Sequence, residues 1–307
     1  MSGLAVVVPN FNGAHVLPRC LDALRAQTLP PDEVVVVDNG STDGSADNLG
    51  PSVRVIKIGR NTGFGAAANR GAGETTAPLI AVLNSDARPV PCWGAAMAAF
   101  AHDAPPQAWS WGGVLTSPGV TIESAGDCYS PAGFAYKHAQ GRRLDELPQA
   151  PWEVFAPPGA APVFRRSVFE ELGGYDPRYF LYLEDIDLAF RARSRGFTSW
   201  VLPGSEVEHD LGASGTGVVA TRFIARNTLW CQVTHAPALN PRLLLHTTRR
   251  ELEDAHGRGV TAAYLRGRIG AMTALPRLLA LRRSERRARS VADAALLRAC
   301  NLPGALA

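Results

Sequence analysis

The sequence has 307 residues, of which 46% are hydrophobic and 19% are charged, a composition typical of one large folded domain or a domain with an appendage. The formal net charge of +3 is too small to indicate a nucleic-acid partner, and none is expected. The five cysteines are odd in number and widely spread, and no CxxC pair suggests zinc or redox chemistry, so a reducing compartment is expected.

The chain starts with MSGLAVVVPN, which lacks the features of a signal peptide and is predicted to be a strand. No apolar run approaches the roughly 20 residues that cross a bilayer, so a cytoplasmic protein is expected. The arginine-rich segment RRSERRAR, at 282–289, either solvates a helix or contacts an anionic membrane surface. Peripheral contact with the inner face of the cell membrane therefore stays open.

In the first hundred residues, short β-branched runs alternate with helical segments, the pattern of a parallel sheet covered by helices. The predicted strands are Leu4–Asn10, Glu33–Gly40, Val53–Gly59 and Leu79–Ala87. The predicted helices are Ala14–Gln27, Ser45–Leu49, Gly65–Gly73 and Pro91–His102. Ligands bind outside the carboxyl ends of the strands in such sheets, so the polar residues there should converge. These residues are Asn10, Asp38, Asn39, Asn84 and Asp86.

The middle of the chain, 116–161, is rich in Gly, Pro and Ala, and we expect an irregular or hairpin-bearing insertion there. A short helix from Ser167, an acidic helix and a strand at Thr198–Leu202 follow. Beyond Val218 the chain is predicted to be helical and arginine-rich, with breaks at APALNP and after Gly257.

This pattern predicts an α/β domain at 1–217. A helical region at 218–307 completes the chain.

Two strand-end loops could bind a nucleotide. In VVVVDNGSTDGS, the carboxylate of Asp38 can accept a hydrogen bond from the N3–H group of uracil or thymine, although a plain turn explains the segment equally well. The loop RNTGFGAAANRG contains Asn61 and Gly65 and enters a helix, where free N–H groups suit a phosphate. Its spacing is not GxGxxG, so the dinucleotide fingerprint does not apply.

The segment LNSDA places Asn84 and Asp86 together after an apolar strand, where their oxygens could hold a divalent cation or form an Asx turn. His209, in VEHDLGASG, is either a satisfied polar residue or a further ligand of that ion. A mixed oxygen and nitrogen site favours Mn²⁺ over Mg²⁺.

The stretch YFLYLEDIDLAFRARSRG, at 179–196, places Glu184 and Asp185 in the first turn of a helix, where the helix dipole favours ionised carboxylates. A carboxylate there could act as a general base, or the cluster could only stabilise the helix. Asp187 and Arg191 are four residues apart and should pair on the helix surface.

The order and spacing of these motifs resemble family 2 inverting glycosyltransferases with the GT-A fold. The motifs are VVVPNFNG, VVVVDNGSTDGS, NTGFGAAANRG, VLNSDA, GGYDPRYFLYLEDIDLAFR and VEHDLGASG. The last two, with the Ser-Gly loop, are most similar to the bacterial rhamnosyltransferase branch. The resemblance implies an α/β fold with a GT-A type, Rossmann-like nucleotide-binding sheet flanked by helices and a C-terminal helical extension. Within residues 1–217 it implies a donor-binding half at 1–115 and an acceptor and base half at 116–217.

The resemblance also implies roles for single residues. Asp185 corresponds to the catalytic base, and Glu184 would orient the acceptor or the base. Asp86 corresponds to the last acid of the metal-binding DxD motif and His209 to a metal-coordinating histidine, for Mn²⁺ or Mg²⁺. Nucleotide-sugar binding is expected from Pro9, Asn10, Asp38, Asn61, Gly65, Asn84, Ser85 and Arg226. Asn84 stands where the DxD motif has its first acid.

The implied reaction moves a sugar, expected to be a 6-deoxyhexose such as rhamnose, from a dTDP- or UDP-sugar to an acceptor hydroxyl by single displacement. A glycan, a lipid-linked sugar and a natural product all stay open as acceptors. The C-terminal helices could form a homodimer or contact a membrane. Two alternatives are a sugar nucleotidyltransferase and an inactive nucleotide-sugar-binding protein. A sugar nucleotidyltransferase would need a glycine-rich, basic loop near the N-terminus, and the segment PNFNGAHVLPRC does not have one.

Overall fold

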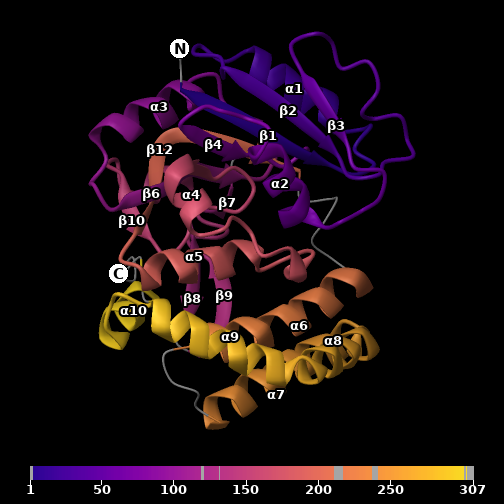
Figure 1. Ribbon diagram of the computed structural model, residues 1–307, viewed down its shortest axis with the longest axis vertical. Helices are drawn as coiled ribbons and strands as arrows, with labels where there is room; N and C mark the ends of the chain where they lie inside the picture. The colour runs from indigo at the N-terminus through magenta and orange to yellow at the C-terminus, as the bar shows by residue number, and fades with distance from the viewer. Residues whose placement is uncertain are drawn as a thin grey trace.

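The computed structural model places an α/β unit at one end of the molecule and C-terminal helices at the other, with α5 and a small hairpin between them (Figure 1). It describes residues 3–118, 121–130, 132–210, 217–236, 241–300 and 302.

One mixed sheet forms the α/β unit, in the strand order β10-β12-β6-β11-β4-β1-β2-β3, with β5 paired to β12 and β7 to β6. Its strands are β1 (Leu4–Asn10), β2 (Glu33–Asp38), β3 (Arg54–Lys57), β4 (Leu79–Val82), β5 (Ala87–Pro89), β6 (Ala108–Thr116), β7 (Ile122–Ser124), β10 (Trp152–Val154), β11 (Val163–Arg165) and β12 (Thr198–His209). Strands β4, β1, β2 and β3 are parallel neighbours, as predicted, so their carboxyl ends lie at one edge.

Helices cover both faces of the parallel strands, which is why β1 is buried along its whole length and reads as a continuous apolar run. On one face Val6 and Val8 pack with Leu17 of α1 and Trp93 of α3. On the other face Val7 packs with α2 and α5 residues. The helices are α1 (Leu17–Arg25), α2 (Phe64–Ala72), α3 (Trp93–Asp103), α4 (Arg166–Glu171) and α5 (Glu184–Ser194).

The predicted helical C-terminal region is confirmed. It contains α6 (Val218–His235), α7 (Pro241–Gly257), α8 (Thr261–Thr273), α9 (Leu275–Ala288) and α10 (Asp293–Cys300). The hairpin of β8 (Asp127–Ser130) and β9 (Phe134–Lys137), predicted for the middle of the chain, connects this region to the sheet through contacts with α6 and α10. Among the described helices, none is long and apolar enough to cross a membrane.

Three local predictions were wrong or incomplete. The helix expected at Ser45–Leu49 is a turn, because Gly44, Asn48 and Gly50 all adopt positive φ angles and leave no room for a helical turn. The strand expected at Leu79–Ala87 divides into β4 and β5 around the polar segment that follows Val82.

The third omission is β6, which the sequence analysis left unassigned. Trp109 and Trp111 lie on it and are buried in the core. Its Gly113 is required because a Cβ atom there would lie 1.6 Å from the carbonyl oxygen of Ser205. The two adjacent glycines, Gly112 and Gly113, conceal this strand in the sequence.

Candidate functional site

Asn10 and Asp38 lie side by side at the ends of β1 and β2, directly opposite each other in the strand register, and both are buried. The Asn10 amide donates hydrogen bonds to the hydroxyl groups of Ser41, at 3.2 Å, and Ser45, at 2.8 Å. The Asp38 carboxylate accepts one from the Ser41 N–H, at 2.9 Å. The strand ends therefore converge, as the sequence predicted, and Pro9 precedes Asn10 on the same buried strand.

Asn10 also contributes an unused acceptor. Its Oδ1 atom is buried and, among the described residues, has no hydrogen-bond partner. A Cβ atom on Gly13 would lie 2.3 Å from this oxygen and 3.5 Å from the Ser85 hydroxyl oxygen, so the three residues meet at one point. A buried oxygen without a donor is what a ligand N–H or O–H would satisfy.

The loop before α2 is held by side-chain amides. Asn39 accepts from both the N–H and the hydroxyl of Thr62, each at 2.9 Å, and Asn61 accepts from the Gly63 N–H at 2.9 Å. A Cβ atom on Gly65 would lie 2.8 Å from the Cβ of Tyr175, so this glycine lets α2 pack closely against the segment before α5. Asn61 and Gly65 shape the loop, and their contact with a nucleotide sugar stays a prediction.

His209, at the end of β12, lies between two carboxylates. Its Nε2 atom is 3.2 Å from Asp86 Oδ1 and 3.3 Å from Asn84 Nδ2. Its Nδ1 atom is 2.8 Å from Glu123 Oε2, and Lys137 pairs with the same carboxylate. Burial lowers the pKa of His209, but hydrogen bonds to Asp86 and Glu123 outweigh it and raise the pKa to about 9.

These residues fit a divalent cation. Asp86 and His209 are both buried, and Asn84 Oδ1 is a buried oxygen with no partner among the described residues. A carboxylate, an imidazole and an amide oxygen suit Mn²⁺ or Mg²⁺, and bound phosphate would supply further oxygens. No group of three or more His, Cys, Asp or Glu residues in the described ranges could hold the ion alone, so a ligand would have to complete the site.

A second carboxylate cluster forms where α5 begins. The Asp185 side chain is half-buried. A Cβ atom added to Gly159 would lie 2.5 Å from Asp185 Oδ2 and 3.7 Å from Asp127 Oδ2. The Gly159 N–H donates to Asp127 Oδ2 at 3.1 Å. Glycine at 159 therefore keeps the Asp185 carboxylate unobstructed. The next residue, Ala160, accepts from the Asn84 N–H at 2.8 Å, which links this cluster to the His209 cluster.

The protonation of this cluster differs from the prediction. Glu184 and Asp185 do occupy the first turn of α5. Burial and then the charge of Asp185 raise the pKa of Glu184 to about 8, and burial also raises the pKa of Asp185. Burial and the charge of Asp185 raise the pKa of Asp127 to about 7. The helix dipole is therefore outweighed by desolvation, and the cluster does not stabilise the helix as ionised surface carboxylates would.

The segment before α5 has an unusual backbone. Phe180, Tyr182 and Leu183 have φ angles of 65°, 67° and 63°, a left-handed conformation that costs roughly 1–2 kcal/mol for each non-glycine residue. Three strained residues directly before Glu184 and Asp185 need support from outside the segment.

Helix α6 provides that support through Asn227, which is fully buried. Its Nδ2 atom donates to the carbonyl oxygens of Tyr179, Leu181 and Tyr182, at 3.1, 2.9 and 2.7 Å. The Phe64 N–H donates to the Phe180 carbonyl at 2.7 Å. Four successive carbonyl groups are thereby held by α6 and the glycine-bearing loop.

Arg226 lies beside Asn227 and is used by the protein itself. Its guanidinium stacks on Phe223 and Trp230, with centroid distances of 4.8 and 4.5 Å, and donates to the Arg178 and Tyr179 carbonyls. Its Nε atom donates to Asn227 Oδ1 at 2.8 Å. Arg226 thus orients the Asn227 amide, while its predicted contact with the nucleotide sugar stays a prediction.

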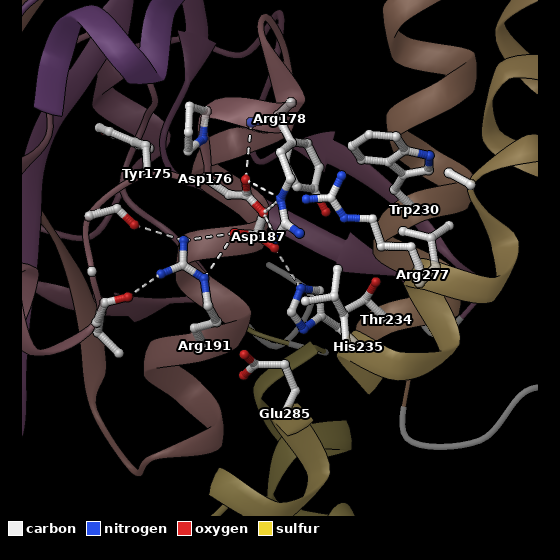
Figure 2. Close-up of a pocket in the computed structure, with 18 residues that line it drawn as sticks. Tyr175, Asp176, Arg178, Asp187, Arg191, Trp230, Thr234, His235, Arg277 and Glu285 are labelled. Atoms are coloured by element: carbon white, nitrogen blue, oxygen red, sulfur yellow. Dashed lines mark hydrogen bonds and ion pairs between the residues drawn. The ribbon is translucent and has the colours of Figure 1, made fainter. Parts of the chain in front are cut away.

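Asp187 points away from this site. Figure 2 shows Arg191 and His235 directed at its carboxylate, with distances of 2.7 Å to each. Burial would raise the pKa of Asp187, but Arg191 and His235 hold it well below the usual range. The predicted pair with Arg191 is confirmed, but its surface location is wrong, since both side chains are nearly buried.

The Asp187 network borders a cavity of about 580 Å³ between the segment 172–179, α5, α6 and α9. None of the predicted site residues is among the described residues that line it. The predicted site lies instead at the strand ends and the Gly159 side of α5. The predicted Ser-Gly loop, in LGASG at 211–215, lies outside the described residues.

Sequence reasoning missed Glu123, Asp127 and Asn227. Glu123 and Asp127 lie in the insertion, which carries no motif that was recognised, and Asn227 is a single polar residue within a helix. A buried position for Asn227 could have been inferred from its spacing with Cys231 and His235, which lie four and eight residues further along one face of α6.

Comparisons with known proteins agree with this architecture. The sequence model of the family described as "Glycosyl transferase family 2" matches residues 5–173. The N-acetylglucosaminyl-diphospho-decaprenol L-rhamnosyltransferase of Mycobacterium tuberculosis is 31% identical over 231 residues, which cover 67% of this chain and 75% of that protein.

Solved structures show the same fold at low identity. GalNAc-T7, crystallised with UDP, GalNAc and Mn²⁺, has a TM-score of 0.57 and 16% identity over 82% of this chain and 54% of that one. TarS of S. aureus has a TM-score of 0.57 and 14% identity over 97% of this chain and 55% of that one.

The fold and the family match define a glycosyltransferase with the GT-A architecture and C-terminal helices. The chain belongs to glycosyl transferase family 2, in its rhamnosyltransferase branch.

Proposed function

We propose that the protein is a metal-dependent, inverting glycosyltransferase that moves a sugar from a nucleotide sugar to an acceptor hydroxyl by single displacement. One observation carries this proposal: residues 159 and 160 join the two polar clusters of the site. Gly159 borders the Asp185 carboxylate, and Ala160 binds the backbone of Asn84 beside Asp86 and His209. The proposed general base and the proposed cation-binding cluster would thus be adjacent, as a displacement at an anomeric carbon requires.

Asp185 is the proposed base. Its half-buried carboxylate would accept the proton of the acceptor hydroxyl as that oxygen attacks the anomeric carbon and inverts it. Its raised pKa makes the ionised form a stronger base than an exposed carboxylate. Glu184, whose pKa is about 8, is protonated at neutral pH and would donate a hydrogen bond that orients the acceptor or the base.

The nucleotide is proposed to lie over the ends of β1, β2 and β4. Asp38 would accept from the base, and Asn10 Oδ1 and Ser85 would contact the ribose or phosphate, with Pro9, Asn61, Gly65 and Arg226 around them. Asp86 and His209, with Asn84 Oδ1, would hold the cation. A divalent ion, Mn²⁺ or Mg²⁺, supplies positive charge that stabilises the departing nucleoside diphosphate.

The comparisons support the choice of substrates. The similarity to a decaprenol-linked rhamnosyltransferase supports a 6-deoxyhexose donor, as a dTDP- or UDP-sugar, and a lipid-linked sugar as the acceptor among the hydroxyl-bearing candidates. A structure with this fold holds UDP and Mn²⁺, which supports a divalent cofactor. The family match favours transfer over nucleotide-sugar synthesis, and the presence of Asp185, Asp86 and His209 argues against an inactive binding protein.

We also propose that residues 1–217 form the catalytic domain, with its donor half at 1–115 and its acceptor and base half at 116–217. The helical region 218–307 then supports the segment before α5 through Asn227. Of the two partners open for this region, a membrane and a second copy, we favour peripheral membrane contact from the cytoplasmic side.

Donor hydrolysis tests the proposed function. Purified protein is given dTDP-, UDP- and GDP-sugars with Mn²⁺, Mg²⁺ or EDTA, and release of the nucleoside diphosphate is measured. We expect release from one donor that requires the metal. Asp185→Asn should lower kcat by about 10²–10⁴-fold, while the dissociation constant of the nucleoside diphosphate stays within about twofold.

The matched control is Asp22→Asn, the same chemical change at an exposed carboxylate on α1. It should leave both quantities unchanged. Turnover that is indifferent to EDTA would contradict the assignment of Asp86 and His209, and a normal kcat in Asp185→Asn would contradict the base.

A further inference from the structure

The two parts of the chain carry opposite charge. Residues 218–307 contain 15 basic side chains, all arginine, against five acidic ones, a net charge of +10. Residues 1–217 contain 16 basic and 23 acidic side chains, a net charge of −7. The modest total of +3 therefore hides a strongly cationic end of the molecule, where the C-terminal helices gather (Figure 1). Such asymmetry favours contact with an anionic partner.

Helix α8 presents an apolar face to solvent at this end. Leu265, Ile269, Met272 and Leu275, the last at the start of α9, are 45%, 61%, 65% and 41% exposed. Leu265, Ile269 and Met272 are four and three residues apart, which places them along one side of α8, and Leu275 follows where α9 begins. Large apolar side chains grouped on the solvent-exposed surface of a protein mark a site of interaction.

The opposite side of α8 is already buried. A Cβ atom on Gly267 would lie 2.3 Å from the Arg222 carbonyl oxygen of α6, and Ala271 is fully buried. Helix α8 therefore has one face packed on the protein and a second apolar face that folding leaves uncovered.

An arginine borders the uncovered face. Arg266, next to Leu265 on α8, is exposed and forms no ion pair with the residues that the structure describes, whereas Arg277 of α9 lines the cavity near Asp187. Apolar side chains flanked by cations form the pattern of a helix that lies in the plane of a membrane interface. The apolar groups would enter the boundary between headgroups and acyl chains, and the guanidinium groups would contact lipid phosphates.

We propose that this face, formed by Leu265, Arg266, Ile269 and Met272 of α8 with Leu275 at the start of α9, docks on an anionic lipid bilayer. Charge decides between a bilayer and a second copy. Pairing two copies through this face would bring together two regions that each carry +10, whereas anionic headgroups neutralise that charge.

The proposal does not depend on the identity of the donor or acceptor. It deepens the membrane contact proposed above by naming the surface, and it is tested without any substrate.

Vesicle co-sedimentation tests the docking face on the full chain. Vesicles of phosphatidylcholine alone are compared with vesicles that contain about one third phosphatidylglycerol. We expect binding only to the anionic vesicles, weakened at least severalfold when NaCl rises from about 0.1 M to about 0.5 M. The double variant Ile269→Glu, Met272→Glu should reduce the partition constant by about tenfold or more, since it replaces inserted apolar groups with repelled charges.

Two further variants separate the causes. Arg266→Gln should lower binding to anionic vesicles by about fivefold while retaining the apolar face. Gln107→Glu with Gln149→Glu adds the same two negative charges at exposed positions of the α/β unit and should bind like the unmodified protein. All these positions are exposed, so melting temperatures should stay close together.

Three results would overturn the proposal. They are absence of binding, equal binding to neutral and anionic vesicles, and a dimer in light-scattering measurements that Ile269→Glu, Met272→Glu converts to monomer. Donor hydrolysis in solution should be unchanged in the docking variants, so a loss of catalysis with intact docking would count against the proposed function alone.

Discussion

Asn227 offers the sharpest test of how the C-terminal helices serve the site. Its amide has two N–H donors, which are shared among three carbonyl oxygens before α5. Asn227→Asp keeps the size and the oxygen that accepts from Arg226 but replaces the donors with an acceptor that faces these carbonyls. The strained backbone at Phe180, Tyr182 and Leu183 then loses its main support.

The expected magnitudes differ for stability and for catalysis. Loss of two buried hydrogen bonds costs about 1–3 kcal/mol. Release of three left-handed residues returns a similar amount, about 3 kcal/mol or more, if the segment relaxes. The melting temperature should therefore change by only a few degrees. The position of Asp185 changes with the segment, so kcat should fall by about tenfold to 100-fold, because a shift of about 1 Å can have that effect.

The assay measures kcat, KM and the dissociation constant of the nucleoside diphosphate. We expect a loss confined to kcat, since the strand ends at Asn10 and Asp38 do not depend on Asn227. Gln232→Ala is the control: it removes another buried amide of α6, which donates to the Gly133 carbonyl at 2.7 Å, without contacting the segment before α5. An equal kcat loss in both variants, or a parallel loss of nucleotide affinity, would refute the positioning role.

Two further predictions concern the buried carboxylates. Glu123→Gln weakens the hydrogen bond that fixes the His209 ring, so Mn²⁺ affinity in the presence of UDP should fall by about 10–100-fold in a spin-resonance titration, whereas Glu153→Gln should have no effect. The folded protein binds more protons than the unfolded chain between the ordinary glutamate pKa of 4.5 and the Glu184 value of about 8, so its stability should fall as pH rises through this window. Glu184→Gln removes that contribution, and thermal melts should show a higher melting temperature than the unmodified protein at pH 8, with the difference shrinking toward pH 5.

The sequence predicts the donor end of the fold well because its signals are local. Continuous β-branched runs indicate buried parallel strands, and the predicted β1 has the same bounds as the observed strand. The convergence of Asn10 and Asp38 follows from strand direction alone, without knowledge of any side-chain contact.

The arrangement of residues 116–235 depends on contacts between distant residues, which explains what was missed. Glu123 meets His209 across 86 positions, and Asn227 meets Tyr179 across 48. No periodicity or spacing encodes such pairs. The β6 strand was missed for a different reason: the backbone of Ser205 requires glycine at 113, and the two glycines of β6 lower its apparent strand propensity.

The three carboxylates of EDID occupy three different environments. Successive residues of a helix are about 100° apart, so Glu184, Asp185 and Asp187 face separate neighbours. Glu184 Oε2 is buried with no hydrogen-bond partner among the described residues, Asp185 faces Gly159, and Asp187 is neutralised by Arg191 and His235.

One short acidic motif therefore contains the proposed proton donor, the proposed base and an observed buried ion pair, and only burial and partners distinguish them. Exchanging the order of these residues would preserve the composition of the helix start and its dipole interaction. It would also place the permanently ionised carboxylate against Gly159 or in the partnerless position, where desolvation opposes charge. The role of each acid is thus fixed by the direction in which α5 presents it, and that direction depends on the left-handed segment that Asn227 holds.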